Sequence, residues 1–302
     1  MTVILFLIPL SEKLLRLAAV GDPDILLSSS AVQLFIFAVP AAFYCKIKNA
    51  EFPRFAKIKR PRLSEIPFVI ASAFTYFFTA IIILYIEFNL FSLPAEETLS
   101  SAGTATSPFG TALAYVIIPA VAEELFFRSV ILSDYAEFKG PVAICVSALF
   151  FAMLHFSFAQ FPLYFLLGAI LATITYATNS SFPSMTIHLI NNALVIFGGS
   201  SIGSFLKETS SSPLSMIIVV ACFMGAFIWM LSSMETLYER RGELYETGDL
   251  PGSRRDMIEN MSDADRLGTK EKKIKPEAKS VFLSPTFFVC ILTFILISFD
   301  II

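Results

Sequence analysis

Long apolar stretches separated by short polar ones make up most of the chain. Segments of about 17 to 25 apolar residues cross a bilayer as helices, because lipid offers no hydrogen-bond partner to backbone N–H and C=O groups. The pattern therefore predicts an all-α fold, a polytopic transmembrane helical bundle. The expected spans are the eight segments 25–46, 67–91, 108–133, 141–159, 161–178, 182–199, 213–233 and 281–300.

The stretch before the first span, residues 1–21, is apolar but is interrupted by Ser11, Glu12, Lys13 and Arg16. A cleaved signal peptide carries its positive charge before its apolar run, whereas here the charge follows the run. We therefore expect an uncleaved N-terminal helix that lies on the membrane interface, with a weak span as the alternative.

The composition supports a membrane protein. Of 302 residues, 56% are hydrophobic, 16% are charged and 32 are Phe, and the mean hydropathy is +0.72. Soluble proteins are about half apolar and about a quarter charged, so the excess apolar surface is expected to face lipid. A net charge of −3 gives no large basic surface, so we expect no nucleic-acid partner. The four cysteines form no CxxC pair, which argues against a cysteine metal site.

The charges of the loops predict the orientation. Residues 46–62 hold seven Lys or Arg, whereas residues 93–107 hold none. Residues 235–280 hold ten Lys or Arg and eleven Asp or Glu. Positively charged loops favour the cytoplasmic side. With eight spans, the loops 46–62 and 235–280 fall on the same side of the membrane. We expect both to be cytoplasmic, with 235–280 a charged, solvated insert.

The third span contains three ionisable residues, Glu123, Glu124 and Arg128. Such a group at the bilayer centre costs on the order of 3 kcal/mol or more, so each one needs a partner or a function. Glu124 and Arg128 are four residues apart, which places them on one helix face as an ion pair. Glu123 is rotated by about 100° from Glu124 and has no local partner.

Both histidines of the chain, His155 and His188, lie in apolar stretches, and Asn192 follows His188 by one helical turn. Two imidazoles and a carboxylate are a known set of zinc ligands with a fourth position open to water. Alternatively, a buried glutamate can act as a general base for water, with His or Asn stabilising an oxyanion. Both chemistries are hydrolytic. The sequence has no serine nucleophile elbow and no HExxH helix, so neither an acyl-enzyme nor a zincin pattern is supported.

Three short motifs resemble those of the CPBP family, the CAAX proteases and bacteriocin-processing enzymes, which include the type II CAAX prenyl endopeptidase. The family pattern is EExxxR, FxxxH and HxxxN on successive core helices. Here it runs through Glu123, Glu124 and Arg128, then Phe151 and His155, then His188 and Asn192. The resemblance covers about residues 108–200. One departure is Asn179-Ser180-Ser181, where the family usually has Thr-Gly-Ser.

The resemblance implies a CAAX-type intramembrane endopeptidase that hydrolyses a peptide bond of a membrane-associated protein or peptide, with prenylated CAAX-type proteins as candidates. It implies a catalytic set whose members line one polar cavity, with Arg128 as a structural brace. Zinc bound by Glu123, His155 and His188 would make it a metalloprotease, and a metal-free glutamate mechanism is the alternative. The implied catalytic set is Glu123, Glu124, His155, His188 and Asn192.

We expect a location in the plasma membrane of a prokaryote, and the spans, the charged loops and the resemblance over 108–200 together divide the chain into five parts. The parts are N-terminal helices with a basic loop (1–107), the catalytic core (108–200), a span (201–234), the charged insert (235–280) and a final span (281–302). Two other functions fit the residues: a transporter or channel that uses Glu123 and the histidines as a proton or metal relay, or a catalytically silent scaffold.

Overall fold

The computed structural model describes residues 25–47, 56–91, 107–136, 138, 140–247, 282 and 284–299. Within these ranges the regular secondary structure is entirely helical, so the predicted all-α class is confirmed. The predictions for residues 1–21 and for most of the insert 235–280 lie outside the described residues.

Helices occur at all eight predicted places, and a short 3₁₀ turn, η1 (Leu63–Glu65), precedes the second. The first and second are α2 (Ile25–Ile47) and α4 (Ile66–Phe91). The third is a continuous rod of α6 (Pro108–Thr111), η2 (Ala112–Ile117), α7 (Ile118–Glu124), η3 (Leu125–Ile131) and α8 (Leu132–Tyr135). The others are α9 (Gly140–Met153), α10 (Phe161–Thr178), α11 (Phe182–Ser211), α12 (Pro213–Thr247) and α16 (Pro285–Ser298).

The helices differ from the prediction in length. Four of them are long and apolar enough to cross a membrane, within Leu63–Asn89, Phe161–Thr178, Phe182–Ser210 and Leu214–Arg240. By contrast, α9 and α16 have 14 residues each. Each rises about 21 Å at ~1.5 Å per residue, which is short of a hydrocarbon core of about 30 Å. The prediction of a span over 141–159 is therefore too long, whereas α12 extends into the predicted insert.

The third rod contains two π-helical stretches, η2 and η3. Pro119 lies just after η2 and has no N–H to donate, so the wider turns before it accommodate the missing hydrogen bond. The second stretch, η3, begins directly after Glu124 and contains Arg128. Stretches of π-helix occur mostly at functional sites, and here both flank the paired glutamates.

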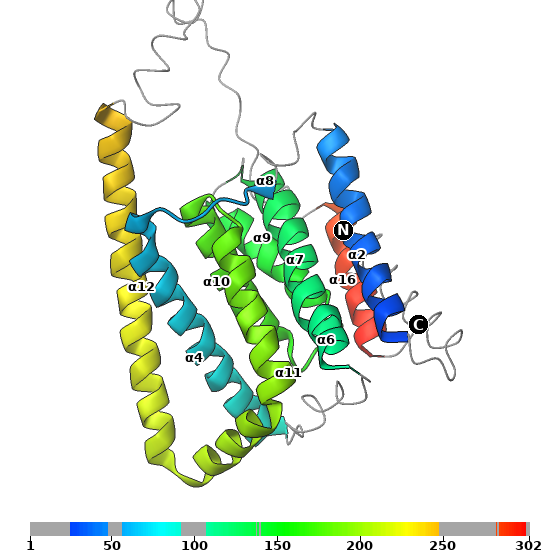
Figure 1. Ribbon diagram of the computed structural model, residues 1–302, viewed down its shortest axis with the longest axis vertical. Coiled ribbons are helices and arrows are strands. Elements are labelled where there is room, and N and C mark those ends of the chain that lie inside the picture. The colour runs from blue at the N-terminus through cyan, green and yellow to red at the C-terminus, as the bar shows by residue number, and fades with distance from the viewer. Residues whose placement is uncertain are drawn as a thin grey trace, which may run out of the picture.

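The helices pack side by side, with α4 and α12 at one edge and α2 and α16 at the other (Figure 1). The helix α4 packs on both α12 and α10, and α2 packs on α7. One apolar cluster of aromatic side chains, including Phe37, Phe127 and Phe151, fills the space around α2, the third rod, α9 and α16. A second cluster joins α4, α10 and α12. The polar residues of α7 and α11 therefore lie between two apolar clusters.

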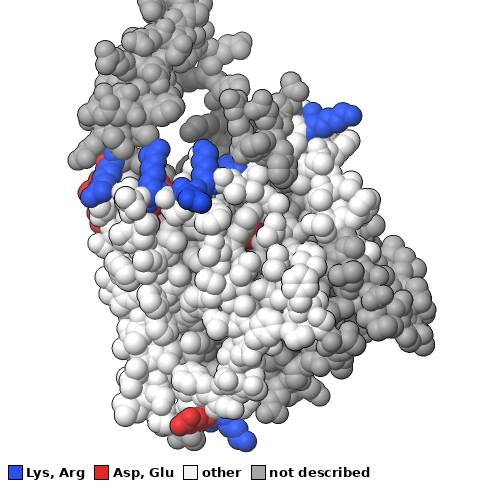
Figure 2. Space-filling model, in the orientation of Figure 1, with Lys and Arg blue, Asp and Glu red and all other residues white. Residues whose placement is uncertain are grey.

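Charged residues gather at the ends of the bundle. Figure 2 shows Lys and Arg along one rim, and the side face between the two rims is almost wholly uncharged. The C-terminal ends of α2 and α12 lie at the same end of the bundle, as the orientation prediction requires (Figure 1). Large apolar side chains such as Phe35 and Phe43 are exposed on the outer surface. The chain is therefore an integral membrane protein with its apolar sides towards lipid.

Candidate active site

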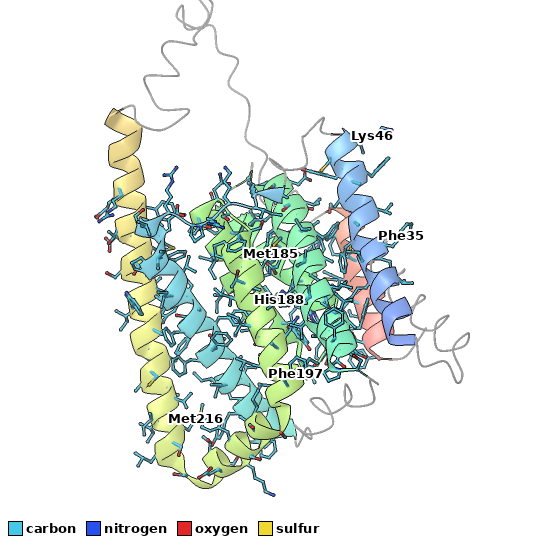
Figure 3. The ribbon with its side chains drawn as sticks, in the orientation of Figure 1. Phe35, Lys46, Met185, His188, Phe197 and Met216 are labelled. Carbon is cyan, nitrogen blue, oxygen red and sulfur yellow. The ribbon has the colours of Figure 1, made fainter. Side chains whose placement is uncertain are left out.

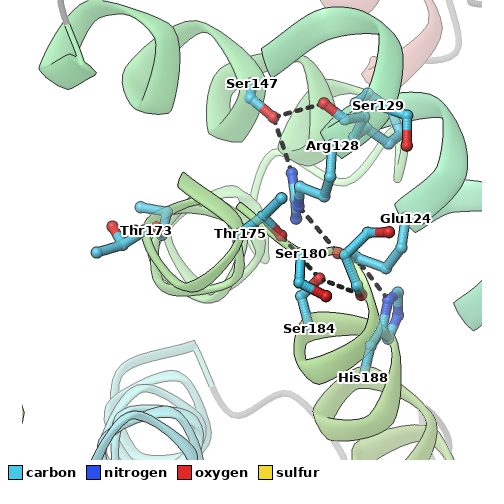
Figure 4. A network of polar contacts seen from close by, with 12 residues as sticks. Glu124, Arg128, Ser129, Ser147, Thr173, Thr175, Ser180, Ser184 and His188 are labelled. Atoms are coloured by element: carbon cyan, nitrogen blue, oxygen red, sulfur yellow. Dashed lines mark hydrogen bonds and ion pairs between the residues drawn. The ribbon is translucent and has the colours of Figure 1, made fainter. Parts of the chain in front are cut away.

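Glu124 lies at the centre of the polar network. Its Oε2 accepts a hydrogen bond from Arg128 Nε at 3.0 Å, and both side chains are 0% exposed. Its Oε1 is 3.3 Å from His188 Nδ1, across 64 residues of sequence. Figure 4 shows Glu124 between Arg128 and His188, and Figure 3 places His188 in the interior of the bundle. The predicted ion pair is confirmed, and the same carboxylate also orients a histidine.

Arg128 is held by a third helix as well. Its Nη1 donates to Ser147 Oγ on α9 at 2.8 Å, and that hydroxyl donates to the Phe127 carbonyl at 3.1 Å. The guanidinium also lies over the Phe151 ring, 5.1 Å from its centroid. A cation over an aromatic face gains electrostatic stabilisation when both are shielded from water. Arg128 therefore joins η3 to α9 through one charged side chain.

Glu123 has a different environment from Glu124. It is 5% exposed, and its buried Oε2 has no hydrogen-bond partner among the described residues. It lies within electrostatic range of His188 and Arg128 without bonding to either through that oxygen. A buried carboxylate oxygen without a partner is costly, so it needs an explanation in function. The sequence predicted this difference between the two neighbouring glutamates.

His155 lies in the turn that follows α9 and not in a helical span. The amides of His155 and Phe156 donate to the carbonyls of Ala152 and Met153, which closes the helix end. Phe156 has a φ of 47°, the left-handed conformation that terminates many helices and that a bulky side chain rarely adopts. His155 Nδ1 donates to the Phe151 carbonyl at 2.9 Å. The turn therefore fixes both the position of the ring and its tautomer.

The Phe151 ring is the point around which the motif residues gather. Its centroid is 5.0 Å from the centroid of His155 and 5.7 Å from that of His188. The helix α10 can approach this ring closely because Gly168 has no side chain. A Cβ on Gly168 would lie 2.9 Å from Phe151 Cδ1. The phenylalanine of the FxxxH motif thus positions the side chains of the other two motifs.

Tyr164 of α10 is a residue that the sequence analysis missed. Its ring stacks on His155 with a centroid distance of 3.5 Å and an interplanar angle of 17°. Its hydroxyl donates to Gln160 Oε1 at 3.2 Å. One signal could have found it: Tyr164 lies one helical turn before Gly168, on the face that packs against α9. Tyr164 completes the surroundings of His155.

Asn192 and Glu87 are two further polar residues of the helices. Asn192 is half-buried on α11, one turn beyond His188, and its place in a shared polar cavity stays a prediction. Glu87, near the end of α4, is 5% exposed and has a buried Oε1 with no partner among the described residues. Glu87 lies outside the three motifs, and its position near a helix end gave no reason to single it out.

The hydrogen bonds of His155 and His188 favour the tautomer that a metal ligand requires. Because a carbonyl and a carboxylate can only accept, both Nδ1 atoms carry a proton, so the neutral form of each ring has its lone pair on Nε2. However, the described residues contain no group of three His, Cys, Asp or Glu that could hold a metal ion. The donor chemistry fits zinc, whereas the spacing of Glu123, His155 and His188 does not form a three-ligand site.

Comparisons with known proteins find similarity over the part of the chain that contains the three motifs. A family model, "type II CAAX prenyl endopeptidase Rce1-like", matches residues 105–194. The UPF0177 protein YxdF of Lactococcus lactis is 32% identical over 87 residues, which is 29% of this chain and 46% of the relative. This chain therefore spans about half the length of that relative. No solved structure matches. The comparisons confirm the resemblance carried by the three motifs: over residues 105–194 the chain is similar to the Rce1-like family.

Proposed function

We propose that the chain is an intramembrane endopeptidase in which Glu123 activates water for the hydrolysis of a peptide bond. One observation carries the proposal. Glu123 keeps a buried carboxylate oxygen without a hydrogen-bond partner in the described part of the chain, whereas both oxygens of the adjacent Glu124 are engaged. A general base needs an available lone pair at the reacting centre, and Glu123 offers one.

In this proposal the hydrolysis is a general-base reaction. Glu123 takes a proton from a water molecule as the water oxygen attacks the peptide carbonyl carbon. The negative charge that develops on the carbonyl oxygen needs a donor, and the Asn192 amide, one turn from His188, supplies an N–H. Glu123 then returns the proton to the leaving nitrogen as the C–N bond breaks, which gives a carboxylic acid and an amine.

The histidines act as acceptors in this scheme. With Nδ1 donating to Phe151 and to Glu124, a neutral ring of His155 or His188 presents its lone pair at Nε2. In this form the rings can orient the attacking water. Glu124 fixes His188, Arg128 fixes Glu124, and Phe151 separates the two rings.

The substrate class follows from the name of the matched family. A membrane-associated protein or peptide, prenylated at a CAAX-type end, is the candidate substrate. A site between apolar clusters and lipid suits a substrate that carries its own apolar anchor. The bacterial relative supports the predicted location in a prokaryotic plasma membrane.

The direct test reconstitutes the purified chain in lipid vesicles with a prenylated CAAX-type reporter peptide, and products are identified by mass. Cleavage at a single peptide bond is expected, with faster turnover than for the same peptide without its prenyl group. Intact reporter after prolonged incubation, with a chain shown to be folded, would rule out this substrate class. Cleavage of both peptides at equal rates would remove the role of the prenyl group.

Zinc dependence separates the two versions of the chemistry. The spacing of Glu123, His155 and His188 favours the metal-free version, so activity is expected to persist after a strong chelator. Bound zinc in the protein purified without added metal is measured by elemental analysis. If one zinc per chain is found, and is lost together with activity on chelation, then the three residues move together around the ion. Zinc binding should in that case weaken as the solution is made acidic, because protonated imidazole does not bind metal.

Tyr164 gives a test of how His155 is positioned. Tyr164→Leu removes the ring that stacks on His155, and we expect kcat to fall about tenfold to a hundredfold with KM little changed. Tyr164→Phe keeps the ring and removes only the hydroxyl bond to Gln160, so its kcat should stay within about twofold. Equal losses in the two variants would assign the effect to the hydroxyl instead.

A further inference from the structure

A basic segment, residues 56–62, lies between α2 and α4 at the rim where Lys and Arg gather (Figure 2). It contains Lys57, Lys59, Arg60 and Arg62, and the last three are exposed. The segment has almost no regular secondary structure of its own. Four positive charges in seven residues form the densest cluster in the described part of the chain.

Buried serines hold the backbone of this segment. The hydroxyls of Ser129 and Ser181 both donate to the Ala56 carbonyl, and the Ser181 amide donates to the Lys57 carbonyl at 3.0 Å. The Ser180 hydroxyl donates to the Lys59 carbonyl. Because the carbonyls point inward to these donors, the backbone is fixed while the basic side chains remain at the surface.

The departure from the family motif explains part of this arrangement. The link between α10 and α11 reads Asn179-Ser180-Ser181, and a glycine in place of Ser180 would have no hydroxyl for the Lys59 carbonyl. Asn179 has a φ of 49°, which ends α10 and directs both serines towards the basic segment. This chain therefore carries its own means of holding the segment against the helix that bears His188.

The position of the segment matches the level of lipid headgroups. It ends at Arg62, directly before Leu63, where a helix long enough to cross the membrane begins. Ile58 and Leu63 are 51% and 85% exposed beside the charges. Apolar and basic side chains next to each other are typical of the membrane interface. Burial and the nearby Lys59 lower the pKa of Lys57, and an anion at this place would relieve that repulsion.

We propose that residues 56–62 form a binding surface for the headgroups of anionic phospholipids. The cytoplasmic leaflet carries a negative surface potential that attracts juxtamembrane basic residues. The charged insert of this chain is a poorer match, because residues 248–280 contain eight Lys or Arg and seven Asp or Glu. The inference does not depend on the proposed peptidase activity.

The test uses the full chain in neutral detergent, titrated with phosphatidylglycerol or with phosphatidylcholine, and the unfolding temperature is recorded. Phosphatidylglycerol should raise Tm by mass action, and phosphatidylcholine should not. Neutralising three charges, in Lys59→Gln/Arg60→Gln/Arg62→Gln, should weaken apparent binding about a hundredfold, at about fivefold per charge. Lys207→Gln, an exposed lysine on α11 outside the segment, is the matched control and should bind like the wild-type chain.

Several results would overturn the proposal. These are an equal Tm shift with both lipids, an unchanged shift in the triple variant, and an equal shift with glycerol phosphate, which carries no acyl chain. If the triple variant does not fold, Arg60→Gln alone should weaken binding about fivefold. The wild-type shift should also fall steeply between low salt and about 1 M salt, where the Debye length is about 3 Å. A salt-independent shift would contradict binding through these charges.

Discussion

Glu123→Gln is expected to fold like the wild-type chain and to lose cleavage. The amide keeps the shape of the side chain but cannot take a proton from water, and a general base contributes about 10²–10⁴-fold to rate. Folding should be preserved because the buried Oε2 makes no hydrogen bond to any described residue that the substitution could break. The measurement is the initial rate on the prenylated reporter in vesicles, with Tm recorded on the same preparation.

Glu87→Gln is the matched control for this prediction. Glu87 is as little exposed as Glu123 and also has a carboxylate oxygen without a hydrogen-bond partner in the ranges that the structure describes, but it lies on α4 outside the three motifs. Its substitution should leave the cleavage rate within about twofold. A well-folded Glu123→Gln protein that still cleaves at the wild-type rate would show that another group activates the water.

Arg128→Ala is expected to produce the largest loss of stability. It removes the only described ion-pair partner of Glu124 apart from His188 and leaves a carboxylate buried at 0% exposure. Breaking a buried pair from one side costs about 3–5 kcal/mol, to which the lost contacts with Ser147 and Phe151 add. We expect low folded yield, and a lower free energy of unfolding in the protein that can be purified.

Removing both charges tests the cause of that loss. In Glu124→Gln/Arg128→Met no unpaired charge is left, so this double variant should be more stable than Arg128→Ala. It should nevertheless be inactive, because His188 loses the carboxylate that orients it. If Arg128→Ala unfolds at the wild-type temperature, the buried pair contributes little and the residue has another role.

The sequence by itself determined the features that depend on local geometry. The apolar lengths gave the places of all eight helices, because a backbone in lipid must satisfy its own hydrogen bonds. The spacing of four residues gave the bond between Glu124 and Arg128, and the rotation of one residue gave the isolation of Glu123. These relations hold within one helix and need no knowledge of its neighbours.

Helix ends were predicted less well. The apolar run continues through His155, yet α9 stops at Met153, because the backbone turns to the left-handed conformation at Phe156. No glycine marks this turn, so the sequence gives no signal for it. The end of α12 was predicted too early, at residue 233, because the apolar run stops there. The helix nevertheless continues through the charged residues that follow, up to Thr247.

Only the tertiary structure decided which helices meet and through which side chains. Glu124 reaches His188 across 64 residues, Tyr164 stacks on His155, and Ser180 holds Lys59 from a distant loop. Such contacts depend on how closely two helices approach and how they are rotated, and single small residues such as Gly168 set that approach. Spacing along one helix fixes the direction of a side chain, but the partner it finds depends on packing between helices that lie far apart in sequence.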